Sequence, residues 1–157
     1  MKKFAYLAGP ILGCDEGTAN DWRYKVAAAL RAHDIIGISP LRCEPLIGEV
    51  YTASYPDPKF GTARAIGSKN LYDLRTCDLT FAYMPKLAPG ARDSIGTILE
   101  IGAARENNKL IILVTDDPFL QAHPVMTTFT GWTLPTLEDG IDAVIGLLGG
   151  YTGGKNV

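Results

Sequence analysis

The sequence has few cysteines, no long hydrophobic run and no excess of charge of one sign. Its 157 residues include three cysteines without regular spacing, which argues against a disulfide scaffold or a cysteine zinc site. The apolar run 4–12 is only about nine residues long and contains Pro10, whereas a membrane-spanning helix needs ~20. The net charge is −2 and the basic residues are scattered, so we expect no nucleic acid polymer and no membrane as a partner.

Several cofactor, metal and targeting motifs are also missing. The segment 8–13 has neither the GxGxxG fingerprint of dinucleotide-binding proteins nor the lysine of a phosphate-binding P-loop. There is no HExxH, CxxC or EF-hand pattern, so we expect neither a metal nor another cofactor. The start of the chain up to Cys14 superficially resembles a lipoprotein signal, but its removal would delete the first predicted strand. We therefore expect a cytoplasmic protein with reduced thiols.

What the sequence does have is apolar material and turn residues. Hydrophobic residues make up 46% and charged residues 20%, a composition typical of a globular protein. The length predicts a single domain, 1–148, followed by a glycine-rich tail, 149–157. Seventeen glycines and ten prolines indicate sharp turns or close approaches of the backbone to something else.

Short apolar runs alternate with segments of helical periodicity along the chain. This alternation predicts an α/β fold, in which a doubly wound parallel sheet of five strands lies between two helical layers as a three-layer sandwich. The predicted strands are 4–8, 35–39, 79–83, 110–114 and 129–133, and the predicted helices are 22–33, 62–76, 94–107 and 137–148.

In such a sheet, ligands bind beyond the carboxyl ends of the strands, where the strand order reverses. The loops predicted there are 9–18, 40–61, 84–93 and 115–128. Gly9 would let a ligand approach the backbone and Pro10 would stiffen the turn, unless both merely reverse the chain. The loop 40–61 is long and rich in proline, and long loops in compact domains are usually functional.

The most informative residue is a carboxylate, Glu100, in an apolar helix that we expect to be largely buried. Its neighbours one turn away on the same face are all small: Gly96, Thr97, Ala103 and Ala104. The sequence therefore predicts a hollow around one carboxylate, which suits a nucleophile or base facing a small ligand. The alternative is a Glu100 that pairs with a core arginine or points to solvent.

Other candidates carry weaker signals. On the helix before the third strand, Asn70 has an amide that can reach over the site, whereas Asp73 taken alone is interpreted as a solvated charge. Aromatic residues in the first helix and the long loop can stack on a nucleobase, although Trp22 on an amphipathic helix is more often part of a core. These aromatic residues are Trp22, Tyr51, Tyr55 and Phe60.

The chain resembles the nucleoside 2-deoxyribosyltransferase family from residue 4 to about residue 114. The resemblance rests on three segments taken together: 6–10, 70–78 and 93–102, the last of which contains Glu100. The resemblance implies a flavodoxin-like sheet and an enzyme that cleaves the N-glycosidic bond of a 2′-deoxynucleoside and passes the sugar to another nucleobase. It implies that Glu100 attacks the sugar and that Tyr6 positions Glu100. It also implies a homo-oligomer, in which the carboxyl end of one subunit can complete a neighbour's site.

The sequence departs from the family pattern at two positions. Where the best-known members carry an aspartate that serves the base, this chain has Asn70, and an amide is not an acid. Either Asp73 or Asp93 takes over, or the base leaves with hydrogen bonds only. Ser94 stands where transferases often have an aspartate, and it resembles the related nucleoside 5′-monophosphate N-glycosidases, in which a serine helps to bind phosphate.

Arg42 and Arg23 are possible phosphate partners, and each is alternatively a surface charge, while Asp93 would repel a phosphate. We favour the transferase, with the monophosphate N-glycosidase and a non-catalytic nucleotide-binding module as alternatives. The predicted catalytic residues are Glu100, Tyr6, Asn70 and Asp73, and the predicted substrate-binding residues are Gly9, Pro10, Trp22, Arg42, Asp93, Ser94 and Gly96.

Overall fold

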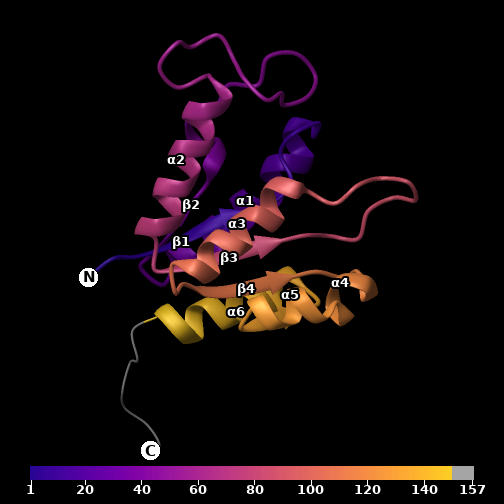
Figure 1. Cartoon of the computed structure of the whole chain (residues 1–157). Coiled ribbons are helices and arrows are strands. Elements are labelled where there is room, and N and C mark those ends of the chain that lie inside the picture. Colours follow the sequence, from indigo (N-terminus) through magenta and orange to yellow (C-terminus); the bar gives the residue numbers. More distant parts are fainter. Residues whose placement is uncertain (150–157) are drawn as a thin grey trace, which may run out of the picture.

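Five short strands form one parallel sheet in the computed structural model of the protein, which describes residues 1–149 (Figure 1). They run side by side in the order β2-β1-β3-β4-β5, so the strand order reverses between β1 and β3. This is the flavodoxin-like order of a doubly wound sheet, and the predicted fold class is confirmed. The strands are β1 (Lys3–Ala8), β2 (Ile35–Ile38), β3 (Leu79–Tyr83), β4 (Leu110–Val114) and β5 (Trp132–Leu134).

Helices cover both faces of the sheet, because successive side chains of each strand point to opposite faces. On one face, Ala5 and Leu7 of β1 pack with α1 and α6; on the other, Tyr6 and Ala8 pack with α2, α3, α4 and α5. The helices are α1 (Glu16–Arg31), α2 (Ala63–Thr76), α3 (Ile95–Glu106), α4 (Pro118–Ala122), α5 (Pro124–Phe129) and α6 (Leu137–Leu148), with a 3₁₀ turn η1 (Pro40–Cys43) after β2.

The elements differ from the sequence prediction in three places. The first helix begins at Glu16 rather than near Trp22, because Asp15 caps it by accepting a hydrogen bond from the Thr18 amide at 2.7 Å. The last strand starts at Trp132, because Phe129 ends the unpredicted helix α5. The prolines at the first turns of α4 and α5 suit helix starts, although the sequence analysis assigned this stretch to a loop.

The expectation that the helix carrying Glu100 is largely buried is wrong. Only Thr97, Ile101 and Ala104 of α3 are buried, whereas Ile95 and Leu99 are 72% and 68% exposed. A helix that packs on a sheet buries only the residues on one of its faces. When apolar residues lie all around the helix, the sequence does not show which face packs on the sheet. The result is an exposed hydrophobic strip beside the carboxyl end of β3.

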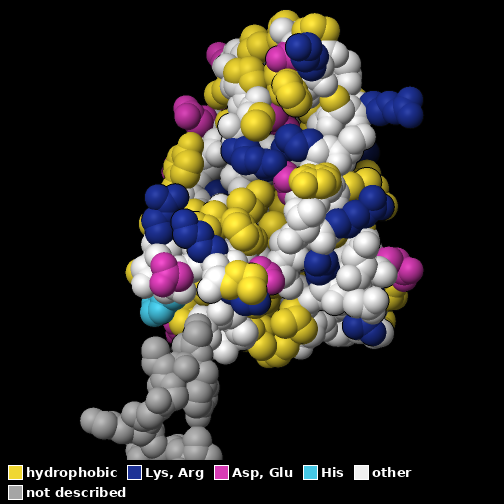
Figure 2. Space-filling view, turned by 90° about the vertical axis from the view of Figure 1, so that its left-hand side faces the viewer, with side chains coloured by type: hydrophobic (Ala, Val, Ile, Leu, Met, Phe, Trp, Pro, Cys, Tyr) yellow, Lys and Arg dark blue, Asp and Glu magenta, His cyan; other side chains and the backbone are white. Residues whose placement is uncertain are grey.

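The face in Figure 2 mixes residue types, and small groups of Lys and Arg side chains lie beside hydrophobic, acidic and other side chains. None of the helices within residues 1–149 combines the length and the apolar character needed to cross a membrane. In the same part of the chain, no three His, Cys, Asp or Glu side chains gather closely enough to share a metal ion. The predicted glycine-rich tail, apart from Gly149, lies outside the described residues.

Two glycines of α6 give a matched test of how tightly this helix packs on the sheet. A Cβ atom at Gly140 would lie 2.4 Å from Val114 Cγ2 and 2.7 Å from Phe81 Cε2, whereas one at Gly146 would meet nothing within 4 Å. We expect Gly140→Ala to lower the free energy of unfolding by about 1–3 kcal/mol, because the core cannot accept the extra methyl group. Gly146→Ala should raise it by roughly 0.5–1 kcal/mol, because alanine favours the helix.

Urea denaturation of both variants beside the parent measures the two changes. A Gly140→Ala protein as stable as the parent would contradict the packing of α6 on β3 and β4 described above.

Candidate active site

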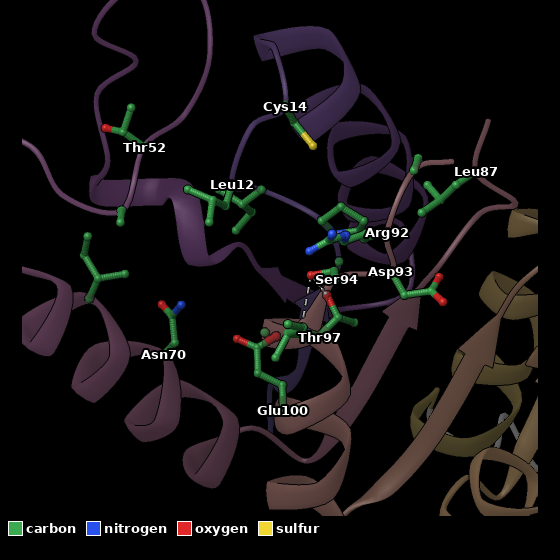
Figure 3. A pocket seen from close by; sticks show the side chains of 18 of the residues that line it. Leu12, Cys14, Thr52, Asn70, Leu87, Arg92, Asp93, Ser94, Thr97 and Glu100 are labelled. Atoms are coloured by element: carbon green, nitrogen blue, oxygen red, sulfur yellow. Dashed lines mark hydrogen bonds between the residues drawn. The ribbon is translucent and has the colours of Figure 1, made fainter. Parts of the chain in front are cut away.

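A cavity of about 460 Å³ lies beyond the carboxyl ends of β1 and β3, where the strand order reverses (Figure 3). This is the position predicted for a ligand site in a doubly wound sheet. Three of the four predicted loops contribute to it, together with one face each of α2 and α3. The lining residues are Gly9, Pro10, Ile11, Leu12 and Cys14; Glu44, Thr52 and Ala53; Ile66 and Asn70; Leu87, Ala91, Arg92, Asp93 and Ser94; and Ile95, Gly96, Thr97 and Glu100.

Glu100 and Tyr6 form the central contact of the cavity. The Tyr6 hydroxyl donates a hydrogen bond to Glu100 Oε1 at 2.7 Å, joining β1 to α3. Tyr6 is fully buried because its side chain points to the sheet face that α3 covers. Of the small residues around Glu100, Gly96 and Thr97 line the cavity, while Ala103 and Ala104 pack against the sheet. The predicted hollow is therefore open on the amino-terminal side of Glu100.

The electrostatic surroundings of Glu100 act in opposite directions. Burial raises the pKa of its carboxyl group, whereas the hydrogen bond from Tyr6 and the positive charges of Arg23 and Lys69 lower that pKa. The pKa of the Tyr6 phenol is raised, by burial first and then by the neighbouring carboxylate. Tyr6 therefore stays protonated and acts as a hydrogen-bond donor that fixes one oxygen of Glu100.

Arg23 is neither a surface charge nor a phosphate ligand. Its guanidinium group is buried and donates to the backbone carbonyls of Leu7 at 3.2 Å, Gly9 at 2.9 Å and Pro10 at 3.5 Å, and also to that of Ala19. Burial lowers its pKa to about 10, so the group is still charged at neutral pH. Arg23 thus holds the end of β1 in place and supplies positive charge beneath the cavity.

Trp22 lies in the core and not among the residues that line the cavity. Its ring stacks on Phe81 and lies tilted against Tyr83, and the Arg23 guanidinium carbon lies 4.5 Å from the ring centroid. A Cβ atom at Gly9 would lie 2.5 Å from this ring, so it is Trp22 that approaches the Gly9 backbone from below. Gly9 and Pro10 themselves line the cavity, whereas Trp22 supports the loop that contains them.

Asp73 and Arg42 are bound to each other outside the cavity. Arg42 donates to both carboxylate oxygens of Asp73, at 2.5 and 2.7 Å, and the Asp73 side chain is only 5% exposed. The interpretation of Asp73 as a solvated charge is therefore wrong, because a bidentate arginine pairs with it. Neither residue lines the cavity; together they join η1 to α2.

Asn70 and Glu100 enter the cavity from facing helices, α2 and α3 (Figure 3). Lys69 Nζ donates to Asn70 Oδ1 at 2.9 Å, so the amide oxygen is occupied and the NH₂ group is left to donate. Asn70 can hydrogen-bond an acceptor on a ligand, but it has no acidic proton to give.

Asp93, Ser94 and Arg92 form the wall at the start of α3. Ser94 caps the helix, and its Oγ accepts hydrogen bonds from the Thr97 amide at 3.3 Å and the Thr97 hydroxyl at 2.9 Å. Figure 3 shows the Asp93 carboxylate directed away from Glu100 and Asn70. Arg92 lines the cavity, whereas Arg23 and Arg42, the phosphate partners suggested by the sequence, do not.

The proline-rich loop after β2 contributes residues that the sequence did not single out. Glu44 and Thr52 line the cavity, whereas Tyr51, Tyr55 and Phe60, predicted as a stacking wall, do not. Tyr51 is buried and its hydroxyl accepts a hydrogen bond from Asn20 at 2.9 Å. The loop's length and proline content pointed to a functional segment, but nothing in the sequence showed which of its side chains face inward.

Comparison with known proteins identifies the family of the chain. A family profile described as nucleoside 2-deoxyribosyltransferase matches residues 5–136, most of the chain. The chain belongs to the nucleoside 2-deoxyribosyltransferase family. The resemblance inferred from the three sequence segments is therefore confirmed. A comparison with curated protein sequences gives no significant match.

Solved structures share the fold at low sequence identity. A 2-deoxyribosyltransferase from Bacillus psychrosaccharolyticus is 19% identical over 87% of this chain and 88% of its own, with a TM-score of 0.61. A 2-deoxyribosyltransferase from Leishmania mexicana is 16% identical over 92% of this chain and 97% of its own, with a TM-score of 0.63. A CMP N-glycosidase from Clostridium botulinum is 18% identical over 93% of this chain and 100% of its own, with a TM-score of 0.55.

The Tyr6–Glu100 hydrogen bond makes a prediction that is independent of any substrate. In Tyr6→Phe the donor is lost, so the charged carboxylate is less stabilised and the pKa of Glu100 should rise further, by on the order of one pH unit. A ¹³C NMR titration of labelled glutamate carboxyl groups, with the Glu100 signal assigned from Glu100→Gln, measures this shift.

Tyr24→Phe is the matched control, since Tyr24 is exposed on α1 and outside the cavity. An unchanged or lower Glu100 pKa in Tyr6→Phe would mean that the phenol does not stabilise the carboxylate.

Proposed function

We propose that the protein is a glycosyltransferase that cleaves the N-glycosidic bond of 2′-deoxynucleosides and transfers the 2-deoxyribosyl group to another nucleobase. One observation carries the proposal: the partly buried Glu100 carboxylate, held by Tyr6 at 2.7 Å, faces a cavity at the reversal of the strand order. Family membership and the two 2-deoxyribosyltransferases of the same fold support the reaction class.

The geometry suits a double displacement. Oε1 of Glu100 accepts the Tyr6 hydrogen bond, so the other oxygen is left to attack C1′ of the sugar. A bond forms between this oxygen and C1′ as the bond from C1′ to the base nitrogen breaks. The departing base takes the electron pair. A second base then attacks C1′ and releases Glu100, as in retaining glycosidases that use a carboxylate nucleophile.

A nucleoside 5′-monophosphate N-glycosidase is the second candidate. Arg92 and Ser94 both line the cavity, and Ser94 stands at the amino terminus of the 12-residue helix α3, where backbone N–H groups favour an anion. The CMP N-glycosidase of similar fold supports this second candidate function. Asp93 between the two residues argues against it, because its negative charge repels a phosphate.

Incubation with 2′-deoxyinosine and adenine, followed by liquid chromatography, tests the proposal. We expect 2′-deoxyadenosine and hypoxanthine to form, and Glu100→Ala to reduce the rate by roughly 10³-fold or more, because the nucleophile is gone. Thymidine as a second donor covers a preference for pyrimidines.

Glu106→Ala is the matched control on the same helix, since Glu106 is exposed and outside the cavity. Base release from a deoxynucleoside 5′-monophosphate without any exchange would favour the hydrolase. Tight nucleotide binding with neither reaction would leave a non-catalytic binding module.

We also propose that the protein is a homo-oligomer in which a second copy covers the exposed strip of α3. Ile95 both lines the cavity and is 72% exposed, with Ile98 and Leu99 beside it on the helix. Exposed apolar side chains at the rim of a pocket are typical of an interface. A second copy placed there would close the open side of the cavity.

Analytical ultracentrifugation tests this assembly. The parent protein should sediment as an oligomer, and Leu99→Glu should shift it to the monomer, because a buried unpaired charge opposes association. Leu147→Glu on α6 is the control and should leave the oligomer intact. A monomeric parent protein would disprove the assembly.

A further inference from the structure

The proposed reaction needs a proton for the departing base, and the residues expected to give it are not placed to do so. Asn70 carries an amide in the cavity. Asp73 is paired with Arg42 outside the cavity, and the Asp93 carboxylate is directed away from Glu100. A different acid has to protonate the base if the bond is to break at a useful rate.

Glu44 is a second carboxylate that lines the cavity, on the wall contributed by the loop after β2. Its Oε1 atom is buried and has no hydrogen-bond partner within residues 1–149. A buried carboxylate oxygen without a partner is costly when charged, so the burial of Oε1 favours the protonated form of Glu44. Glu44 is therefore a carboxyl group that lines the cavity and whose Oε1 atom makes no hydrogen bond within residues 1–149.

The backbone at Glu44 is fixed from several sides. The Glu44 amide donates to Leu41 O at 3.0 Å and so ends η1. The Tyr55 hydroxyl donates to Cys43 O at 3.1 Å, and Lys69 Nζ donates to Pro40 O at 2.5 Å. The Arg42–Asp73 pair joins the same turn to α2. A side chain on so well-anchored a turn can hold a proton at a defined position.

The surroundings of Glu44 act on its carboxyl group in opposite directions. Burial raises the pKa of its carboxyl group above the ordinary value, and the positive charges of Lys69 and Arg23 oppose this rise. Burial first, and then the Glu44 charge, raises the pKa of the Tyr55 hydroxyl, which bonds to the neighbouring carbonyl. Unlike Glu100, Glu44 has no phenol donating to it within the described chain.

We propose that Glu44 is the acid that protonates the departing nucleobase, an inference that rests on the proposed function. As Glu100 attacks C1′ and the glycosidic bond breaks, the electron pair of that bond moves into the base. The Glu44 proton passes to a nitrogen or oxygen of the base, which leaves neutral, and Glu44 becomes a carboxylate. In the transfer step, Glu44 takes a proton from the incoming base as the new C1′–N bond forms.

The test compares two donors that differ in their need for a proton. The base of 2′-deoxyinosine must be protonated to leave neutral, whereas 7-methyl-2′-deoxyinosine already carries the positive charge and its base leaves neutral unaided. We expect Glu44→Gln to lower kcat/KM for base release about 100-fold on 2′-deoxyinosine. On the 7-methyl donor, after subtraction of the uncatalysed rate, the change should stay within about threefold.

Glu49→Gln is the matched control, since Glu49 is exposed in the same loop and outside the cavity, and it should leave both rates unchanged. Activity of Glu44→Gln on the 7-methyl donor also shows that the variant is folded. Glu44→Asp keeps an acid, so it should retain more activity on 2′-deoxyinosine than Glu44→Gln.

Equal losses on both donors would overturn the proposal, because Glu44 would then act in folding or sugar binding. Full activity of Glu44→Gln on 2′-deoxyinosine, or a Glu44→Asp variant poorer than Glu44→Gln, would overturn it as well. A parent protein that releases base from neither donor nor from thymidine would instead refute the proposed function, which separates the two failures.

Discussion

The buried guanidinium of Arg23 is the interaction on which the site depends. The last carbonyls of β1 leave the sheet at its reversal point, and Arg23 satisfies those of Leu7 and Gly9 from below. A buried arginine is costly unless its donors are used, so the loop must follow the path that these bonds define. Burial raises the pKa of both Glu100 and Glu44, and the Arg23 charge is among the groups that oppose this rise. One side chain thus shapes the cavity floor and places positive charge beneath it.

Strand β1 transmits this constraint to the reacting group. Tyr6 is one residue before Leu7, so fixing the end of the strand also fixes the phenol, which then fixes Glu100 across the gap to α3. The helix does not need to be buried for this purpose. It contacts the sheet through Ile101 and Ala104, and its amino-terminal turn remains open to the cavity. Ile95 lies in this amino-terminal turn, away from the sheet contact, and is therefore exposed.

The sequence predicted the sheet, the strand–helix alternation and Glu100, because these depend on local periodicity and on a charge in an apolar segment. It did not predict the partners of long side chains. The sequence left Arg23 and Arg42 as phosphate partners or surface charges, and Asp73 as a catalytic residue or a solvated charge. A guanidinium reaches far from its own backbone, and its partners come from distant segments. Glu44 was missed for a related reason: a loop has no periodicity, so nothing in its sequence marks which side chains face inward.

Two carboxylates in one cavity need different environments if they are to do different work. Arg23 and Lys69 act on both Glu100 and Glu44, so their positive charge does not separate the two. The difference lies in the direct donor: Tyr6 bonds to Glu100 and favours its ionised form, while Glu44 Oε1 has no partner in residues 1–149. The Tyr6 hydrogen bond thus suits Glu100 to attack as a carboxylate, and Glu44, which lacks such a donor, is the group that we propose as the acid. Glu44 follows η1, which is bound to α2 through Lys69 and the Arg42–Asp73 pair, so the proposed acid lies on the same side of the cavity as Asn70.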